Sequence, residues 1–231
     1  MKVIGINGSA RMDGNTALII REVFSELEKN GIETELVQLA GLHIRPCRFC
    51  MGESCMACRG RQACVFRDDD FFGVYEKIKA AEGIILGSPV YGADITAIMR
   101  NFLDRMGMVS VLNPELLRHK VGAAVSAVRR CGGLTTVDAL NHLMLFKEMI
   151  VVGSNYWNIV YGRDPGDVLN DSEGMENMRN LGQNMAWLLQ RLYPAVRWAP
   201  HVSRRCRGAR KRRPAPVPGG EKYFALNQKC P

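Results

Sequence analysis

The sequence predicts an α/β protein in which helices cover both faces of a parallel sheet. Segments with strand-like and helix-like patterns alternate five times along the chain. Several strand segments are apolar throughout rather than at every second residue, which is typical of strands buried on both faces. The length of 231 residues and the hydrophobic content of 47% suit one sizeable globular domain.

The individual elements are predicted from local patterns. The β-branched run at residues 2–7 predicts the first strand, and the apolar spacing of residues 15–30, ended by Gly31, predicts the first helix. We expect the other strands at residues 33–39, 83–88, 121–127 and 150–154, and the other helices at residues 71–81, 96–108, 136–149 and 172–193. Asp68, Asp69 and Asp70 precede the second helix, where a helix N-terminus favours negative charge. The connection over residues 156–171 carries no secondary-structure signal.

The basic charge of the chain is concentrated at its end. Of the net charge of +8, residues 197–231 carry +9, and residues 1–196 carry −1. We therefore predict a folded domain over residues 1–196 and a disordered, Pro/Arg-rich tail over residues 197–231, too polar to fold alone. The tail's basicity does not argue that the domain binds nucleic acid, so we expect no nucleic-acid partner and a solvated tail. The alternative for the tail is contact with nucleic acid or anionic lipid.

The expected location follows from the apolar runs. No run reaches the roughly 20 residues of a membrane helix, and the first ten residues lack the apolar core of a signal peptide. We expect a cytoplasmic protein with no membrane partner.

Ligands of such sheets bind at the carboxyl ends of the strands, which singles out the loops at residues 8–16, 89–94 and 129–133. The first loop contains Ser9, Arg11, Asn15 and Thr16 and leads into a helix. Hydroxyls, a guanidinium and the N–H groups of a helix start suit a phosphate dianion. The loop has neither the Lys-Ser/Thr pair of a Walker loop nor a G-x-G-x-x-G fingerprint. The alternative is an ordinary strand-to-helix turn.

A more specific signal lies in the second loop. Residues 87–94 read Gly-Ser-Pro-Val-Tyr-Gly-Ala-Asp, and residues 99–105 read Met-Arg-Asn-Phe-Leu-Asp-Arg. At these residues the sequence resembles the flavodoxin-like, NAD(P)H-dependent FMN reductases, and residues 8–11 and 14–16 resemble that family's FMN phosphate loop. The resemblance extends to about Tyr193. It implies a flavodoxin-like, doubly wound, five-stranded parallel sheet with strand order 2-1-3-4-5.

The resemblance also implies residue roles. Four residues of the first loop would hold the FMN phosphate: Ser9, Arg11, Asn15 and Thr16. Four residues of the second loop would lie along the isoalloxazine and contact its polar edge through backbone groups: Pro89, Val90, Tyr91 and Gly92. Residues 126–133, with Ser126 and Arg129, would form a third flavin loop. The alternatives are a packed surface aromatic for Tyr91 and a solvated side chain for Arg129. The cofactor carries the chemistry, so no catalytic side chain is implied.

Five of the eight cysteines lie within 18 residues, namely Cys47, Cys50, Cys55, Cys58 and Cys64. Disulfides are rare in a reducing cytoplasm, so a metal or cofactor is the better explanation. Pro46-Cys47 and Cys50, with Cys64 followed by Asp68-Asp69, resemble the iron-sulfur flavoprotein branch of the same superfamily, which implies a [4Fe–4S] cluster in a Cys-rich insertion at residues 42–67. The implied ligands are Cys47, Cys50, Cys58 and Cys64. About five residues are inserted after Cys50, so Cys55 competes with Cys58 for the third position, and two CxxC pairs also satisfy the spacing for zinc.

These observations together predict an FMN-dependent oxidoreductase. We expect it to pass electrons from NAD(P)H through FMN and a [4Fe–4S] cluster to an acceptor such as a quinone, a flavin or ferredoxin. The alternatives are a non-enzymatic electron carrier or redox sensor, and a reductase whose Cys segment is stapled by zinc. Flavin sites in this superfamily are commonly completed across subunits, so a homo-oligomer, dimer or tetramer, is implied.

Overall fold

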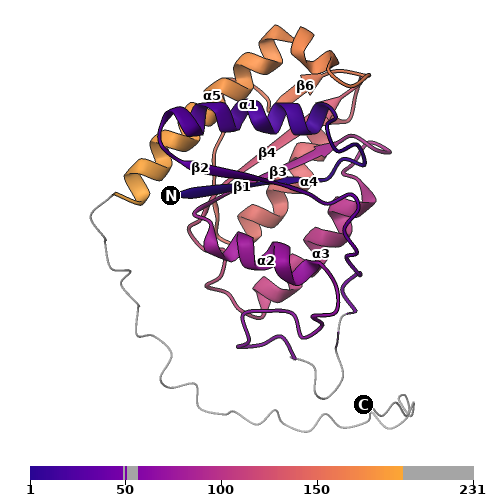
Figure 1. Ribbon diagram of the computed structural model, residues 1–231, viewed down its shortest axis with the longest axis vertical. Coiled ribbons are helices and arrows are strands. Elements are labelled where there is room, and N and C mark those ends of the chain that lie inside the picture. Colours follow the sequence, from indigo (N-terminus) through magenta and orange to yellow (C-terminus); the bar gives the residue numbers. More distant parts are fainter. Residues whose placement is uncertain (49, 51–56, 195–231) are drawn as a thin grey trace, which may run out of the picture. The chain divides into compact units, whose positions relative to one another are not determined.

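The computed structural model describes residues 1–48, 50 and 57–194, and its centre is a parallel sheet (Figure 1). The strands follow the order β2-β1-β3-β4-β5, and β6 also pairs with β4. Their bounds are β1 Lys2–Asn7, β2 Glu33–Gln38, β3 Gly83–Pro89, β4 Val121–Val128, β5 Ile150–Val151 and β6 Ile159–Tyr161. Every pairing is parallel. The predicted strand order is confirmed.

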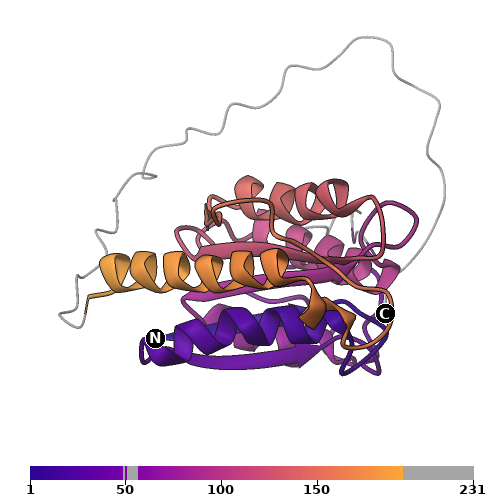
Figure 2. The same ribbon diagram turned by 90° about the horizontal axis from the view of Figure 1, so that it is seen from above.

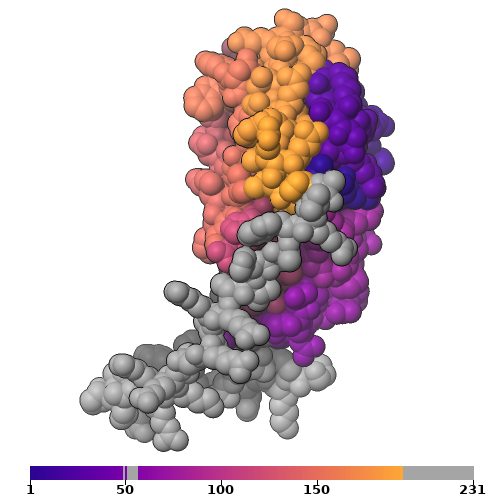
Figure 3. Space-filling model, turned by 90° about the vertical axis from the view of Figure 1, so that its left-hand side faces the viewer, coloured from indigo at the N-terminus to yellow at the C-terminus, as the bar shows by residue number. Residues whose placement is uncertain are grey.

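Helices cover both faces of this sheet (Figures 1 and 2). Their bounds are α1 Asn15–Lys29, α2 Phe71–Ala80, α3 Ala97–Val111, α4 Gly133–Phe146 and α5 Ser172–Leu192. The helices α1 and α5 pack side by side on one face, as Figure 3 also shows, and α2, α3 and α4 cover the other. Each face has its own apolar core, one around Ile20 and Met185 and the other around Phe71 and Phe102.

The central strands are apolar because both of their faces are covered. All eight residues of β4 are buried, as are the first six of β3. A strand between two helical layers has no solvated side, so it cannot show polar alternation. The edge strand β2 is only partly buried, and Val37 is its one fully buried residue.

The last sheet position differs from the prediction. The expected strand at residues 150–154 pairs only over Ile150–Val151, beside the start of β4. The chain then leaves the sheet and returns as β6, which pairs with Ser126, Ala127 and Val128 near the end of β4. Residues 156–171 therefore contain a strand, although their sequence carries no secondary-structure signal. A strand of three residues is too short to show a periodic apolar pattern in the sequence. It forms here by pairing with the end of β4.

Two helices also differ from their predicted bounds. Helix α4 begins at Gly133 rather than at residue 136 and ends at Phe146, and α3 continues to Val111. None of the helices in the described part of the chain combines the length and apolarity needed to cross a membrane. The predicted tail and Cys55 lie outside the described residues.

Candidate functional site

The loops that follow β1, β3 and β4 meet at the carboxyl edge of the sheet and form one pocket that is partly open to solvent. Eight of the ten predicted flavin residues line it: Ser9, Arg11, Asn15, Thr16, Pro89, Val90, Tyr91 and Arg129. Gly92 and Ser126 are not among its lining residues. The lining also includes Ala127, which belongs to the predicted third loop, and Gly162 and Arg163, which the sequence did not single out. The pocket thus combines three loops with the segment that follows β6.

The start of α1 offers unsatisfied donors to this pocket. Thr16 Oγ1 is buried and has no hydrogen-bond partner within the described residues. Gly14, the residue before α1, supplies no side chain to cap the N–H groups of the first turn. The helix start approaches the sheet closely because Gly87 is small: a Cβ there would lie 3.1 Å from Thr16 Cγ2 and 2.6 Å from Ile20 Cδ1. A buried hydroxyl and free amides beside Arg11 form a donor set that fits a phosphate.

Hydrogen bonds to the neighbouring strands hold the first loop in place. The Ser9 amide donates to Asn7 Oδ1 at 3.0 Å, and the Ser9 carbonyl accepts from Gln38 Nε2 at 2.6 Å. The Arg11 amide donates to Ser9 Oγ at 3.1 Å. At the other side, Thr96 Oγ1 donates to the Gly8 carbonyl at 2.7 Å. The loop conformation is therefore set before any ligand binds.

The second loop ends in a tight turn. Tyr91 and Asp94 exchange backbone hydrogen bonds of 2.9 and 3.1 Å, and the two residues between them, Gly92 and Ala93, both have positive φ. The Val90 amide donates to Ala127 O at 3.3 Å, so the amides of Val90 and Tyr91 are already paired inside the protein. Tyr91 presents a ring that is 53% exposed at the pocket.

The third loop contributes charge. Arg129, Arg11 and Arg163 come from three segments far apart in the sequence, and all line the pocket. Ser126 lies behind the loop on β4, opposite Ser88 in register, and its buried Oγ has no partner within the described residues. With three guanidinium groups at one edge of the sheet, the pocket favours an anionic ligand.

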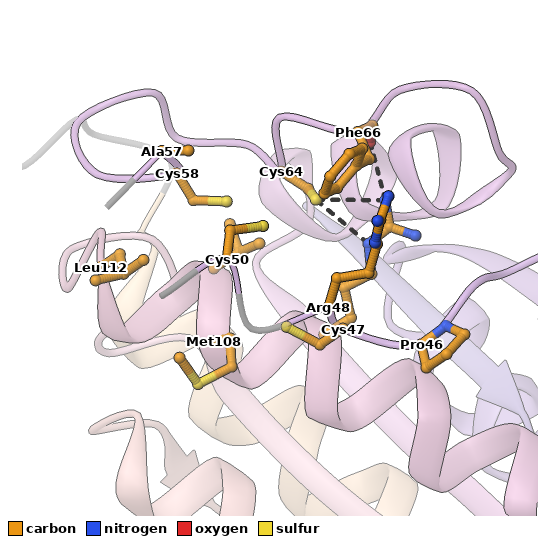
Figure 4. Close-up of a pocket in the computed structure, with 12 residues that line it drawn as sticks. Pro46, Cys47, Arg48, Cys50, Ala57, Cys58, Cys64, Phe66, Met108 and Leu112 are labelled. Atoms are coloured by element: carbon orange, nitrogen blue, oxygen red, sulfur yellow. Dashed lines mark hydrogen bonds between the residues drawn. The ribbon is translucent and has the colours of Figure 1, made fainter. Parts of the chain in front are cut away.

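The four predicted metal ligands line a second pocket. Figure 4 shows the sulfurs of Cys47, Cys50, Cys58 and Cys64 facing a common space. The remaining lining residues are mostly apolar: Pro46, Ala57, Phe66, Met108, Val109 and Leu112, with Arg48 and Arg105. No disulfide joins the cysteines that the structure describes. Such a donor set, four thiols in an apolar pocket, suits an iron–sulfur cluster.

The described thiols include close neighbours, because Cys58 interacts with both Cys64 and Cys50. Among the described residues, no group of three His, Cys, Asp or Glu side chains is arranged to hold a metal ion. Zinc bonds to sulfur at about 2.3 Å would draw tetrahedral ligands to within about 4 Å of one another. Burial raises the pKa of the Cys58 thiol, opposed by a hydrogen bond to the Val65 backbone and reinforced by Cys64 and Cys50.

The three aspartates before α2 fasten the start of the Cys-rich segment. Asp70 Oδ2 accepts from the His43 amide at 2.7 Å, and Asp69 Oδ2 accepts from the Arg45 amide at 3.0 Å. Asp68 pairs with the Arg45 guanidinium, which lowers the pKa of that carboxyl. Asp70 makes no capping bond to α2. The charge run that was expected only to suit a helix N-terminus therefore also anchors the loop that carries Cys47.

Comparisons with known proteins show the family of the chain. Residues 1–164 match the family model of NADPH-dependent FMN reductases. An iron-sulfur flavoprotein of Methanocaldococcus jannaschii is 40% identical over 193 residues, which cover 80% of this chain and 96% of that protein. An iron-sulfur flavoprotein of Methanosarcina thermophila is 32% identical over 194 residues, covering 82% and 96%.

Solved structures show the same fold at low sequence identity. A flavodoxin from the domain Archaea superposes with a TM-score of 0.54 at 16% identity, covering 82% of this chain and 99% of that one. RosB superposes with a TM-score of 0.65 at 17% identity, covering 97% and 100%. The predicted flavodoxin-like fold is confirmed. With the family model and the identities above, these comparisons show that the chain belongs to the NADPH-dependent FMN reductase family and has iron-sulfur flavoproteins among its relatives.

Proposed function

We propose that the protein is an FMN-dependent oxidoreductase that takes electrons from a reduced nicotinamide and passes them through FMN and a [4Fe–4S] cluster to an acceptor. The proposal rests on one observation: the same fold contains two pockets, and each is lined by a different set of donor groups. One pocket offers a buried unpaired hydroxyl, free helix amides and guanidinium groups, and the other offers four thiols. The family membership supports oxidoreductase chemistry.

In the flavin pocket, the protein would bind FMN and orient its ring. The first turn of α1, Thr16 Oγ1 and Arg11 would hold the FMN phosphate, and Pro89, Val90 and Tyr91 would line the ring. When bound, FMN supplies hydride acceptance from a nicotinamide and a cluster supplies single-electron transfer. The half-exposed Tyr91 leaves the outer side of the pocket accessible to a planar substrate.

In the second pocket, Cys47, Cys50, Cys58 and Cys64 would hold the cluster. Four thiols in a mostly apolar pocket support a cluster, and the zinc staple is the alternative that metal analysis tests. The walls are mostly apolar and Cys64 is buried, whereas Cys47, Cys50 and Cys58 are partly exposed. An apolar shell of this kind tunes the potential of a redox centre. The helix α3 contributes to both sites: Thr96, the residue before it, holds the phosphate loop, and Arg105 lies at the thiol pocket.

The redox chemistry of FMN and a cluster also indicates which electron acceptors the protein would use. FMN together with a one-electron centre suits a quinone, a flavin or ferredoxin as acceptor. An electron carrier or redox sensor that exchanges electrons only with proteins would not accept electrons from a nicotinamide. Adding a reduced nicotinamide to the protein therefore distinguishes this alternative from the reductase.

The test uses protein purified without oxygen. We expect the isolated protein to contain FMN and about four irons per chain, the content of a [4Fe–4S] cluster, and its flavin absorbance to bleach on anaerobic addition of NADH or NADPH. Bleaching with dithionite but with neither nicotinamide would favour the carrier. Zinc in place of iron would leave only the flavin reductase.

We also propose that the chain self-associates. The exposed aromatic pair Tyr156 and Trp157 lies in the segment between β5 and β6, which leads to the pocket lining at Gly162. Aromatic residues are enriched in protein–protein interfaces. Light scattering should give a dimer or tetramer at micromolar concentration, and a monomer would contradict this.

A further inference from the structure

We propose that Arg105 is a positioning residue that raises the reduction potential of the cluster by donating N–H···S hydrogen bonds to Cys64. Arg105 Nε lies 3.4 Å and Nη2 3.3 Å from Cys64 Sγ, both with hydrogen-bond geometry (dashed lines at Cys64 in Figure 4). The inference rests on the proposed function, since it concerns the cluster of that site. Arg105 lies on α3, 41 positions from Cys64, and acts through this cysteine rather than on a substrate.

The guanidinium is held from every side, so its contact with sulfur is not incidental. Nη2 also donates to the Phe66 carbonyl at 2.9 Å, and Nη1 donates to the Arg45 carbonyl at 3.3 Å and pairs with Asp69 Oδ2. The group lies over the Phe71 ring at 4.3 Å. The side chains of Arg105 and Asp69 are 3% and 0% exposed. An arginine fixed in this way keeps its Nε–H and Nη2–H groups directed at the Cys64 sulfur.

The direction of the effect follows from charge. A cluster becomes more negative when it accepts an electron, and part of that charge resides on its sulfur ligands. Hydrogen bonds to those sulfurs therefore stabilise the reduced state and raise the potential. Burial reduces the screening of this interaction. Asp69 offsets the positive charge of Arg105, so the N–H groups directed at Cys64, rather than a net charge, carry the effect.

The experiment compares Arg105→Lys and Arg105→Met with Arg179→Met in the full-length, anaerobically purified protein. Arg105→Lys keeps a positive charge to pair with Asp69 but loses the paired N–H donors of the guanidinium. Arg105→Met loses both the charge and the donors. Arg179 is a matched control because it forms ion pairs with Glu22 and Glu176 on the opposite face of the sheet. The measurements are iron content, flavin content and a spectroscopic redox titration that follows cluster and flavin separately.

We expect both Arg105 variants to lower the ratio of reduced to oxidised cluster at a fixed solution potential. A drop of about tenfold corresponds to 59 mV for a one-electron couple. The flavin potential should stay unchanged, and Arg179→Met should match the wild type in both potentials. If Arg105→Met fails to fold because Asp69 loses its partner, Arg105→Lys decides the question.

Two results would overturn the inference alone. One is Arg105→Lys with full iron and the wild-type cluster potential. The other is an equal shift of the cluster and flavin potentials, because it would reveal a general change in structure. A wild-type protein without iron would overturn the inference together with the cluster part of the proposed function, so the two failures are distinguishable.

Discussion

Asn15 holds the backbone of Gly166, 151 positions further along the chain: the Gly166 amide donates to Asn15 Oδ1 at 2.8 Å. The Asn15 Nδ2 group donates in turn to the Asp164 carbonyl at 3.0 Å. These two bonds fasten the segment that follows β6 to the start of α1, and Gly162 and Arg163 of this segment line the flavin pocket. The predicted role of Asn15 in phosphate binding is thus joined by a structural one, the closure of the pocket.

Replacing Asn15 with Ala should weaken flavin binding. The substitution removes two hydrogen bonds to backbone, each contributing about 0.5–1.5 kcal/mol, so the segment with Gly162 and Arg163 loses its fastening. We expect FMN affinity to fall by about tenfold, the equivalent of ~1.4 kcal/mol. Fluorescence titration of the apoprotein with FMN measures it.

Asn30→Ala is the matched control for this prediction. Asn30 Nδ2 donates to the Glu26 carbonyl at the other end of α1, so it forms a similar bond away from the pocket. The control should bind FMN as the wild type does. Equal weakening in both variants would show that the effect comes from α1 stability and not from closure of the pocket.

The phosphate loop is tested by the double substitution Arg11→Ala and Thr16→Ala. It removes a guanidinium and the buried hydroxyl that lacks a partner within the described residues. A hydrogen bond to a charged group contributes about 1.5–3 kcal/mol, so the cofactor should separate from the protein on gel filtration. FMN, with one phosphate, should be the flavin released, because the sequence has no dinucleotide fingerprint. Full retention of flavin would contradict the assignment of this loop.

The sequence predicts those parts of the fold that depend on local pattern. The strands β1, β3 and β4 begin at the predicted residues, because an unbroken apolar run between turn residues is a strong local signal. The strand β6 was missed because its three residues acquire a strand conformation only by pairing with β4. Gly162 and Arg163 join the pocket through that pairing, so no spacing rule could have indicated them.

Long-range contacts limit the prediction of the second site in the same way. The clustering of cysteines indicates a metal or cofactor, and the resemblance supplies a ligand set that the structure brings to one pocket. No local pattern in the sequence indicates the contact of Arg105 with Cys64 and Asp69. Arg105 lies on α3, and α2 and β3 separate this helix from the Cys-rich segment along the chain. A basic residue inside a helical pattern normally predicts a solvated side chain.

The packing of α1 against α5 gives a test of the fold itself. A Cβ at Gly182 would lie 2.7 Å from the Val23 carbonyl oxygen and 2.7 Å from Glu26 Cβ, whereas a Cβ at Gly73 on α2 would meet nothing within 4 Å. Gly182→Ala should lower the free energy of unfolding by about 1–3 kcal/mol, because overpacking forces the helices apart. Gly73→Ala should raise it by up to about 1 kcal/mol through helix propensity. Denaturant unfolding measures both, and stabilisation by both would disprove the close contact.

The ligand set of the Cys pocket is the last prediction, and single Ser substitutions test it. Cys47, Cys50, Cys58 and Cys64 line one pocket with their sulfurs facing a common space. A [4Fe–4S] cluster needs four thiolates, and a serine hydroxyl is a poor substitute for any of them. Each of the four variants should therefore lose the broad absorbance near ~400 nm and about four irons per chain, the content of one such cluster.

Two further variants serve as controls. Cys131→Ser changes an exposed thiol outside this pocket and should keep both the absorbance and the iron. Cys55, which lies outside the described residues, competes with Cys58 for the third position because about five residues are inserted after Cys50. The spacing of Cys58 to Cys64 matches the interval implied by the resemblance, so Cys55→Ser should also keep its iron. If Cys55→Ser loses the iron while Cys47→Ser retains it, the ligands are drawn from residues 50–64, and Cys47 is a bystander at the pocket wall.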